Sequence, residues 1–132
     1  MKAITVCEPY ASAIIFGPKR VENRQQPWKF RGRLLIHAGK STKFMGTLTA
    51  AELADWPEYD ESKLTFGAIL GSVEVYDCVE LRTPSRDDVW ACGPYCLLLR
   101  APEPFAKPIP YRGALGLFDV PDHVLKAAAP CA

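Results

Sequence analysis

A long segment with strand character, residues 66–80, constrains the fold more than any other feature of this sequence. Its side chains alternate between apolar and more polar types, as in a β-strand with two different faces. One face would hold Val73, Val75 and Val79, and the other would hold Ser72, Glu74, Tyr76 and Cys78. Gly67 and Gly71 in the same segment indicate bends or bulges of the kind that curve a sheet into a barrel.

Shorter segments rich in β-branched and apolar residues predict further strands. Residues 19–24 form a turn that leads into an extended segment, and residues 101–110 are proline-rich. The other predicted strands are residues 2–7, 33–38, 95–101 and 115–120.

Two or three short helices are also expected. The first begins at Pro9 and ends at Gly17, because apolar side chains between them fall on one helical face. The second follows Thr49 and Glu52, which have capping-box spacing. The predicted helices are residues 9–17, 50–56 and 121–128. Together these elements predict an α+β domain built around a small mixed β-barrel.

The length of 132 residues predicts a single domain, residues 1–132. The apolar start of the chain resembles a signal peptide, but Glu8 and Pro9 interrupt it. No run approaches the roughly 18 apolar residues that cross a bilayer. We therefore expect a soluble, cytoplasmic protein without a membrane partner.

The five cysteines predict free thiols, because an odd count in a reducing compartment does not form a disulfide framework. Cys92 and Cys96 are separated by three residues, whereas zinc sites usually have two between their cysteines and a second pair. We expect no metal ion and no cofactor.

The net charge of +1 excludes a generally basic nucleic-acid-binding protein, but the charge is unevenly distributed. Residues 1–43 carry nine Lys and Arg against Glu8 and Glu22, an excess of +7, and the remaining 89 residues carry an excess of −6. This asymmetry favours a nucleoside, a nucleotide or a short RNA end over a long strand.

The densest polar chemistry lies in residues 17–24, directly after the first predicted helix. Lys19 and Glu22 can converge across a turn, and Glu22 and Arg24 share a strand face on which the guanidinium can hold the carboxylate. The alternative is a solvated charged turn, since charged side chains are mostly exposed.

Gly17, Lys19, Glu22 and Arg24 match the G-x-K-x-x-E-x-R signature, so the chain resembles the ASCH domain, a relative of the PUA RNA-binding fold. The resemblance extends over most of the chain, through residues 9–11, 35–38, 67–75 and 110–118. It implies a small β-barrel with a cleft over the motif that binds RNA or nucleotides. Some small bacterial members are amidohydrolases that deacylate N4-acetylcytidine, and others are reported as nucleases.

The amidohydrolase members use a lysine at the position of Lys19, a glutamate at that of Glu74, and a threonine where this chain has Glu22. The resemblance therefore implies catalytic roles for Lys19 and Glu74, whereas the hydroxyl nucleophile is missing here.

A mechanism without that hydroxyl has Glu22 as the base on a water, oriented by Arg24, with Lys19 stabilising the oxyanion. Glu74, with a raised pKa in a partly buried cleft, would pass a proton to the cytosine N4. Two alternatives stay open: Lys19 is the base and Glu22 binds the substrate, or Glu74 is a carboxylate on a solvated sheet face.

Further residues are expected to contact the ligand. Tyr10 and Trp28 would stack on a base, or else pack in the core. His37, at a strand end, is either a ligand contact or a hydrogen-bonded structural residue. Lys40 follows a glycine as in a P-loop, but Leu34 stands where that motif needs glycine, so Lys40 is expected only to contact a phosphate or carboxylate.

The sequence thus predicts a small amidohydrolase acting on an N4-acylated cytosine or cytidine. The alternatives are a non-catalytic module that binds RNA or a modified nucleotide, and a ribonuclease. By the resemblance, Tyr111 and Arg112 lie near the cleft, where Tyr111 is expected to brace the barrel.

Overall fold

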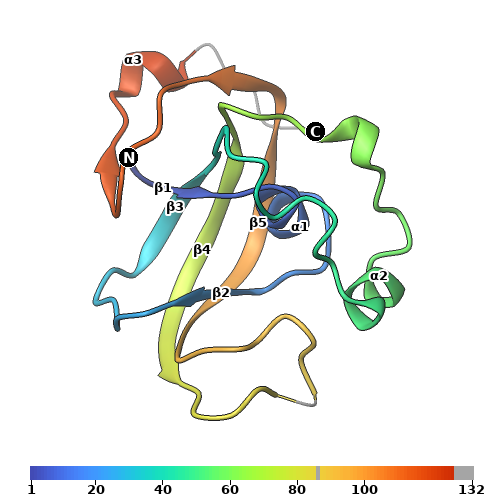
Figure 1. The fold of residues 1–132 in the computed structure, drawn as a ribbon. Helices are drawn as coiled ribbons and strands as arrows, with labels where there is room; N and C mark the ends of the chain where they lie inside the picture. The colour runs from blue at the N-terminus through green and yellow to red at the C-terminus, as the bar shows by residue number, and fades with distance from the viewer. Residues whose placement is uncertain (86, 127–132) are drawn as a thin grey trace.

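The fold is one six-stranded mixed sheet with short helices, seen in a computed structural model that describes residues 1–85 and 87–126 (Figure 1). The strand order is β2-β5-β4-β3-β1-β6, and only the β1–β3 pair is parallel. The strands are β1 (Lys2–Val6), β2 (Val21–Arg24), β3 (Gly32–Ala38), β4 (Ala68–Glu80), β5 (Tyr95–Pro110) and β6 (Phe118–Asp119). The helices are α1 (Tyr10–Ile15), α2 (Ala50–Asp55), a 3₁₀ turn η1 (Glu61–Lys63) and α3 (Asp122–Leu125). The α+β prediction is confirmed.

The sheet curls strongly but does not close, since β2 and β6 remain its edges. β2 and β1 are four places apart in the strand order, which is about 19 Å in a flat sheet. The Arg24 side chain nevertheless donates a hydrogen bond to the Thr5 carbonyl at 3.3 Å. An arginine side chain therefore bridges the gap where a closed barrel would have strand pairing.

Bulges in β4 produce the curvature and change which residues face inward. Gly71 lies so close to β5 that a Cβ there would be 2.4 Å from the Glu103 carbonyl oxygen, which confirms the predicted bend. Val73 and Val75 are buried as predicted. The predicted inward position of Val79 is wrong: a register shift after Val75 reverses the alternation, so that Val79 is exposed.

The main core lies between the inner face of the sheet and α1, which Figure 1 shows packed against the strands. Both predicted features of the early helices are present: α1 follows Pro9 as expected, and Thr49 and Glu52 form the capping box of α2. The fully buried core side chains include Ile4, Ile14, Leu34, Ile36, Val73 and Leu97.

β5 continues through the proline-rich segment, which the sequence did not indicate. The Leu99 N–H still donates to the Arg20 carbonyl at 2.9 Å, but beyond it this strand has no β2 partner. Its outer edge there needs no backbone donors and tolerates proline. Ala101, with a φ of 50°, marks the change in direction.

The four cysteines within the described residues, Cys7, Cys78, Cys92 and Cys96, are free thiols as predicted, and Cys131 lies outside those residues. The predicted terminal helix is confirmed for Asp122–Leu125, and its remaining residues 127–128 lie outside them as well. No helix in the described part of the chain combines the length and apolar composition needed to cross a bilayer.

Gly17 ends α1 at a point where a larger residue does not fit. A Cβ at this position would lie 2.7 Å from Cε2 of Trp56 and 3.0 Å from the Ala13 carbonyl oxygen. Trp56 in turn packs edge-on against Trp90, with ring centroids 6.5 Å apart. The absence of a side chain at Gly17 therefore allows the Trp56 indole to pack beside residues 17–24.

We predict that Gly17→Ala lowers the free energy of unfolding by about 1–3 kcal/mol, because the added methyl overpacks against the indole. Urea denaturation measures the change. In a Trp56→Ala background the same substitution should cost clearly less, since the contacts with the indole are gone and the contact with the Ala13 carbonyl oxygen remains. An equal cost in both backgrounds would contradict the packing explanation.

Glu8 is a fully buried carboxylate that fixes the start of α1. Its oxygens accept hydrogen bonds from the Ser12 backbone N–H at 2.7 Å and from the Thr65 backbone N–H at 3.3 Å, and lie 2.5 Å from the Ser12 hydroxyl. Burial raises the pKa of Glu8 above its ordinary value of 4.5, against the opposing effect of the Ser12 and Thr65 hydrogen bonds.

A raised pKa means that the folded chain keeps a proton that the unfolded chain has released. The free energy of unfolding therefore falls as pH rises from 4.5 through the folded-state pKa. We predict that Glu8→Gln removes this loss, so that the variant gains stability relative to the parent across that window and by a constant amount above it. Denaturation at a series of pH values measures the difference, and the exposed Glu58→Gln serves as control. A difference that does not change with pH would contradict the assignment.

Candidate functional site

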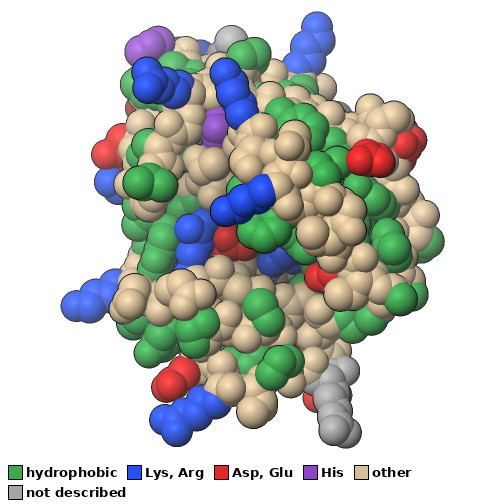
Figure 2. All heavy atoms as spheres, viewed as in Figure 1, with side chains coloured by type: hydrophobic (Ala, Val, Ile, Leu, Met, Phe, Trp, Pro, Cys, Tyr) green, Lys and Arg blue, Asp and Glu red, His purple; other side chains and the backbone are tan. Residues whose placement is uncertain are grey.

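A cleft of about 560 Å³ opens between the end of β1, strand β2 and two loops. Figure 2 shows it as a hollow with basic and acidic side chains at its floor. The motif supplies Lys19, Glu22 and Arg24 to this floor. Tyr10, Phe44, Glu52 and Trp90 are among the residues of its walls.

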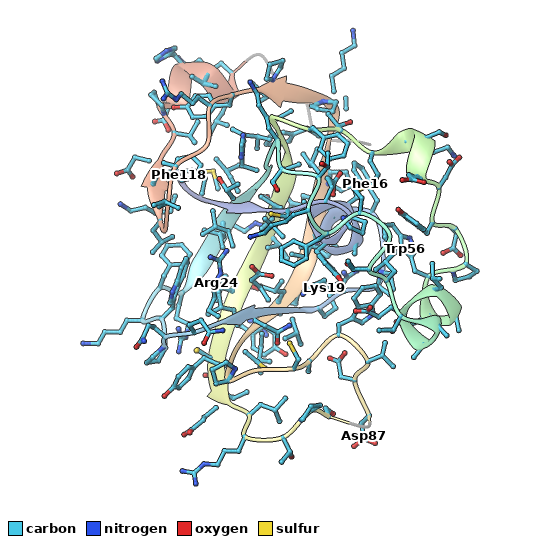
Figure 3. The ribbon with its side chains drawn as sticks, in the orientation of Figure 1. Phe16, Lys19, Arg24, Trp56, Asp87 and Phe118 are labelled. Carbon is cyan, nitrogen blue, oxygen red and sulfur yellow. The ribbon has the colours of Figure 1, made fainter. Side chains whose placement is uncertain are left out.

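Local structure brings the motif side chains together. The Lys19 backbone N–H donates to the Ala13 carbonyl, and the Arg20 guanidinium donates to the carbonyls of Ile14 and Gly17, which ties the turn to the end of α1. In β2, Glu22 lies opposite the buried Leu97, so Glu22 and Arg24 face inward. Lys19 and Arg24 both project toward the centre of the molecule (Figure 3).

Glu22 is held between two cations. Its Oε1 lies 3.6 Å from Lys19 Nζ, and its Oε2 lies 3.0 Å from an Arg24 guanidinium nitrogen. Lys19 also donates to the Val21 carbonyl. With Lys19 3% and Glu22 8% exposed, the alternative of a solvated turn is wrong, and the predicted convergence of Lys19, Glu22 and Arg24 is confirmed. These three residues are called the motif cluster below.

Arg24 is fixed by more than Glu22. Its guanidinium carbon lies 5.1 Å from the centre of the Trp28 ring, and it donates to the Thr5 carbonyl. Its Nε is buried and has no hydrogen-bond partner among the described residues. Trp28 packs against the core and is not among the residues that line the cleft, so its place is beneath Arg24 rather than against a ligand.

The walls of the cleft are aromatic. Tyr10 packs edge-on against Phe44, with ring centroids 6.0 Å apart, and its hydroxyl is 3.0 Å from that of Thr47. On the other side, the Trp90 indole N–H donates to Asp55 at 2.8 Å. The loops that carry Phe44 and Trp90 have no sequence signal, and these residues were missed. The capping box drew attention to Glu52 only as part of a helix.

Glu74 does not reach the cleft, because Val73 and Val75 take the inward positions of β4 and turn Glu74 to the outer face. There its Oε2 accepts a hydrogen bond from Arg100 Nε at 2.6 Å. This bond lowers the pKa of Glu74, so the expected proton donor with a raised pKa is corrected to an ion-paired carboxylate.

His37 and Lys40 also lie outside the cleft, in a second hollow on the other side of Thr5. Both ring nitrogens of His37 have partners: Nε2 lies 2.7 Å from the Tyr111 carbonyl, and Nδ1 lies 3.1 Å from the Thr5 hydroxyl. The structural alternative for His37 therefore fits the geometry. Tyr111 stacks on Phe118, with ring centroids 6.4 Å apart, which is the bracing expected of it.

Part of the basic excess of the first 43 residues is paired with acidic residues from later in the chain. Ion pairs join three of its side chains to acidic residues of the later strands. These pairs are Lys2–Asp119 at 3.1 Å, Arg31–Asp77 at 3.6 Å and Arg33–Glu103 at 3.5 Å. The carboxylate of the site, Glu22, comes from the basic segment itself.

No group of three or more His, Cys, Asp or Glu side chains within residues 1–85 and 87–126 is arranged to hold a metal ion. The motif cluster offers cations and one carboxylate, an arrangement suited to anions, oxyanions and proton transfer.

The fold resembles solved structures of the ASCH protein from Zymomonas mobilis. That protein is 16% identical, with 95% of this chain and 90% of that chain covered and a TM-score of 0.56. A serine-to-alanine variant of it matches at 15% identity, 97% and 96% coverage and a TM-score of 0.58. A tyrosine-to-phenylalanine variant of it matches at 16% identity, with 96% of this chain and 94% of that chain covered and a TM-score of 0.55. At these identities the likeness shows the fold.

No curated protein matches the sequence. A family model does: the ASCH domain model covers residues 4–105, from β1 into the second half of β5, and includes the whole motif cluster. Family model, fold and motif agree, and the chain belongs to the ASCH domain family.

Proposed function

We propose that this protein is a small amidohydrolase that removes the acyl group from an N4-acylated cytosine or cytidine. The observation that carries the proposal is a carboxylate, Glu22, held by Lys19 and Arg24 at the floor of a cleft with aromatic walls. A fixed carboxylate can take a proton from water, and cationic N–H donors beside it can stabilise an oxyanion.

Amide hydrolysis here needs no group outside the cleft. Glu22 takes a proton from a water whose oxygen attacks the acyl carbon, and the carbonyl oxygen becomes an oxyanion. The C–N4 bond then breaks, and Glu22 returns the proton to N4, which releases a carboxylic acid and the cytosine amine. Glu22 thus replaces the proton donor once expected at Glu74.

The contacts of Lys19 support its role as the oxyanion partner. An ammonium group has three N–H donors. The Val21 carbonyl accepts one and Glu22 is positioned for the second, which leaves a third for the substrate oxygen. The alternative, in which Lys19 is the base and Glu22 binds the substrate, uses the same contacts.

The dimensions and walls of the cleft support a nucleoside-sized substrate. Its volume of about 560 Å³ is in the range of small-molecule sites. Tyr10, Phe44 and Trp90 bring aromatic rings to it, and a nucleobase can stack on such rings.

A second candidate is non-catalytic binding of a modified nucleotide or a short RNA in the same cleft. One observation favours it: both Glu22 oxygens are already paired, which suits a permanent acceptor for the N–H edge of a base. The third candidate, ribonuclease activity, is tested in the same assay with an oligoribonucleotide as substrate.

We predict that the protein converts N4-acetylcytidine to cytidine and that Glu22→Gln lowers kcat/KM by about 100-fold or more, because an amide cannot accept the proton. Lys19→Met should lower it by about 100-fold through loss of oxyanion stabilisation. Ultraviolet absorbance and mass spectrometry measure conversion, and calorimetry measures cytidine binding by each variant.

The matched control is Glu103→Gln, an equal change on the outer face. Glu22→Gln should bind cytidine within about threefold of the parent while hydrolysis is lost, which separates chemistry from folding. A parent protein that binds cytidine but leaves N4-acetylcytidine intact would move the assignment to the binding module.

We predict that Glu74→Gln leaves kcat/KM for the same substrate within about twofold of the parent, because Glu74 faces away from the cleft. Assaying Glu74→Gln on N4-acetylcytidine distinguishes a site built on Glu22 from the site implied by the amidohydrolase members, in which Glu74 is catalytic. A loss comparable to that of Glu22→Gln, with an unchanged melting temperature, would return Glu74 to the active site.

A further inference from the structure

A second hollow of about 810 Å³ adjoins the cleft, and the proposed function does not use it. It is lined by the backbone turns at residues 39–40, 67 and 110–113 and by the side chains of Thr5 and His37. Lys40 and Arg112 supply two positive charges, and none of the described residues that line it is acidic. We call it the basic hollow.

Hydrogen bonds lock the rim of the basic hollow. Gly67 donates to the Ala38 carbonyl at 2.7 Å and accepts from the Tyr111 N–H at 3.1 Å, and the Tyr111 carbonyl in turn accepts from His37 Nε2. Because a carbonyl oxygen only accepts, His37 Nε2 carries the proton. The buried His37 side chain of β3 therefore fixes the turn that carries Arg112.

Glycines bring these turns close enough to form one concave surface. A Cβ at Gly113 would lie 2.6 Å from the Thr5 hydroxyl and 2.7 Å from His37 Cε1. At Gly67 it would lie 3.0 Å from Lys40 Cε, so the stem of Lys40 packs on this glycine and holds the ammonium at the rim.

The two cations of the basic hollow are available to a ligand. Within the described part of the chain, neither Lys40 nor Arg112 forms an ion pair or a side-chain hydrogen bond, whereas the Arg33 guanidinium contacts both Ser72 and Glu103. A Lys and an Arg that line one hollow without an acidic neighbour suit a phosphate, which can accept charge-assisted hydrogen bonds from both.

Among the residues that the structure describes, Thr5 is the one that lines both the cleft and the basic hollow. The Thr5 carbonyl accepts a hydrogen bond from the Arg24 guanidinium on the cleft side, and the Thr5 hydroxyl contacts His37 Nδ1 on the other side. The end of β1 thus separates the two sites, and Thr5 borders both.

We infer that the basic hollow is a phosphate subsite, so that the neighbouring cleft prefers a nucleotide or an RNA end to the free nucleoside. The base lies over the motif cluster, and its phosphate lies between Lys40 and Arg112. The inference rests on the proposed function for the base, but the phosphate contact itself does not depend on hydrolysis.

The experiment compares cytidine, cytidine monophosphate and a three-nucleotide RNA by calorimetry at low salt, with the parent and Lys40→Ala/Arg112→Ala. The parent should bind the monophosphate about tenfold or more tightly than cytidine, and the double variant should bind both equally. Cytidine affinity itself should not change. The control Lys29→Ala/Arg82→Ala removes the same two residue types outside both sites and should keep the preference.

Inorganic phosphate separates this inference from the proposed function. It should shift the amide resonance of Gly113 in the parent and not in Lys40→Ala/Arg112→Ala, whether or not N4-acetylcytidine is hydrolysed. Absence of that shift, or an equal loss of monophosphate preference in the control variant, would overturn the subsite. Tighter binding of the trinucleotide than of the monophosphate would identify the phosphate as part of an RNA backbone, and equal binding would identify a mononucleotide.

Discussion

The ion pairs of Glu22 with Lys19 and Arg24 organise the molecule around its cleft. Burying a carboxylate is costly unless cations and hydrogen bonds compensate it, so each partner must be held in place. Lys19 is fixed by the end of α1 and the Val21 carbonyl. Arg24 extends from the edge strand β2 to the Thr5 carbonyl on β1. Arg24, which pairs with Glu22, thus also spans the opening of the sheet.

An open, curled sheet has a functional consequence that a closed barrel would lack. In a closed barrel, strand pairing would occupy the space between β1 and β2. Here a side chain bridges that space, and both concave surfaces border the end of β1. The bulge at Gly71 contributes to this curled, open shape, because it allows β4 and β5 to bend together.

The sequence predicted the motif cluster well because its members are near neighbours, and turn and strand geometry over eight residues places them. The same local reasoning found the capping box of α2. The alternation also placed Glu74 on the face opposite Val73 and Val75, as observed, and it was the catalytic role implied by the family resemblance that did not fit. Local reasoning failed for Val79, where a bulge reverses the alternation.

Contacts between distant segments were not predictable from this one sequence. Phe44 and Trp90 reach the cleft on loops without a periodic pattern, and ion pairs between strands join part of the basic segment to the acidic remainder. Lys40 and Arg112 are 72 positions apart, and only the circuit from β3 through Gly67 to Tyr111 brings them to one hollow.

The packing of Trp56 against Gly17 and Trp90 has a consequence for the intrinsic tryptophan fluorescence of the protein. The chain has three tryptophans: Trp90 lines the cleft, Trp56 touches Trp90, and Trp28 lies against Arg24. No indole sits in a remote part of the fold to add an unresponsive background. Because Trp90 lines the cleft, we expect a ligand in the cleft to change the intrinsic tryptophan fluorescence of the unlabelled protein.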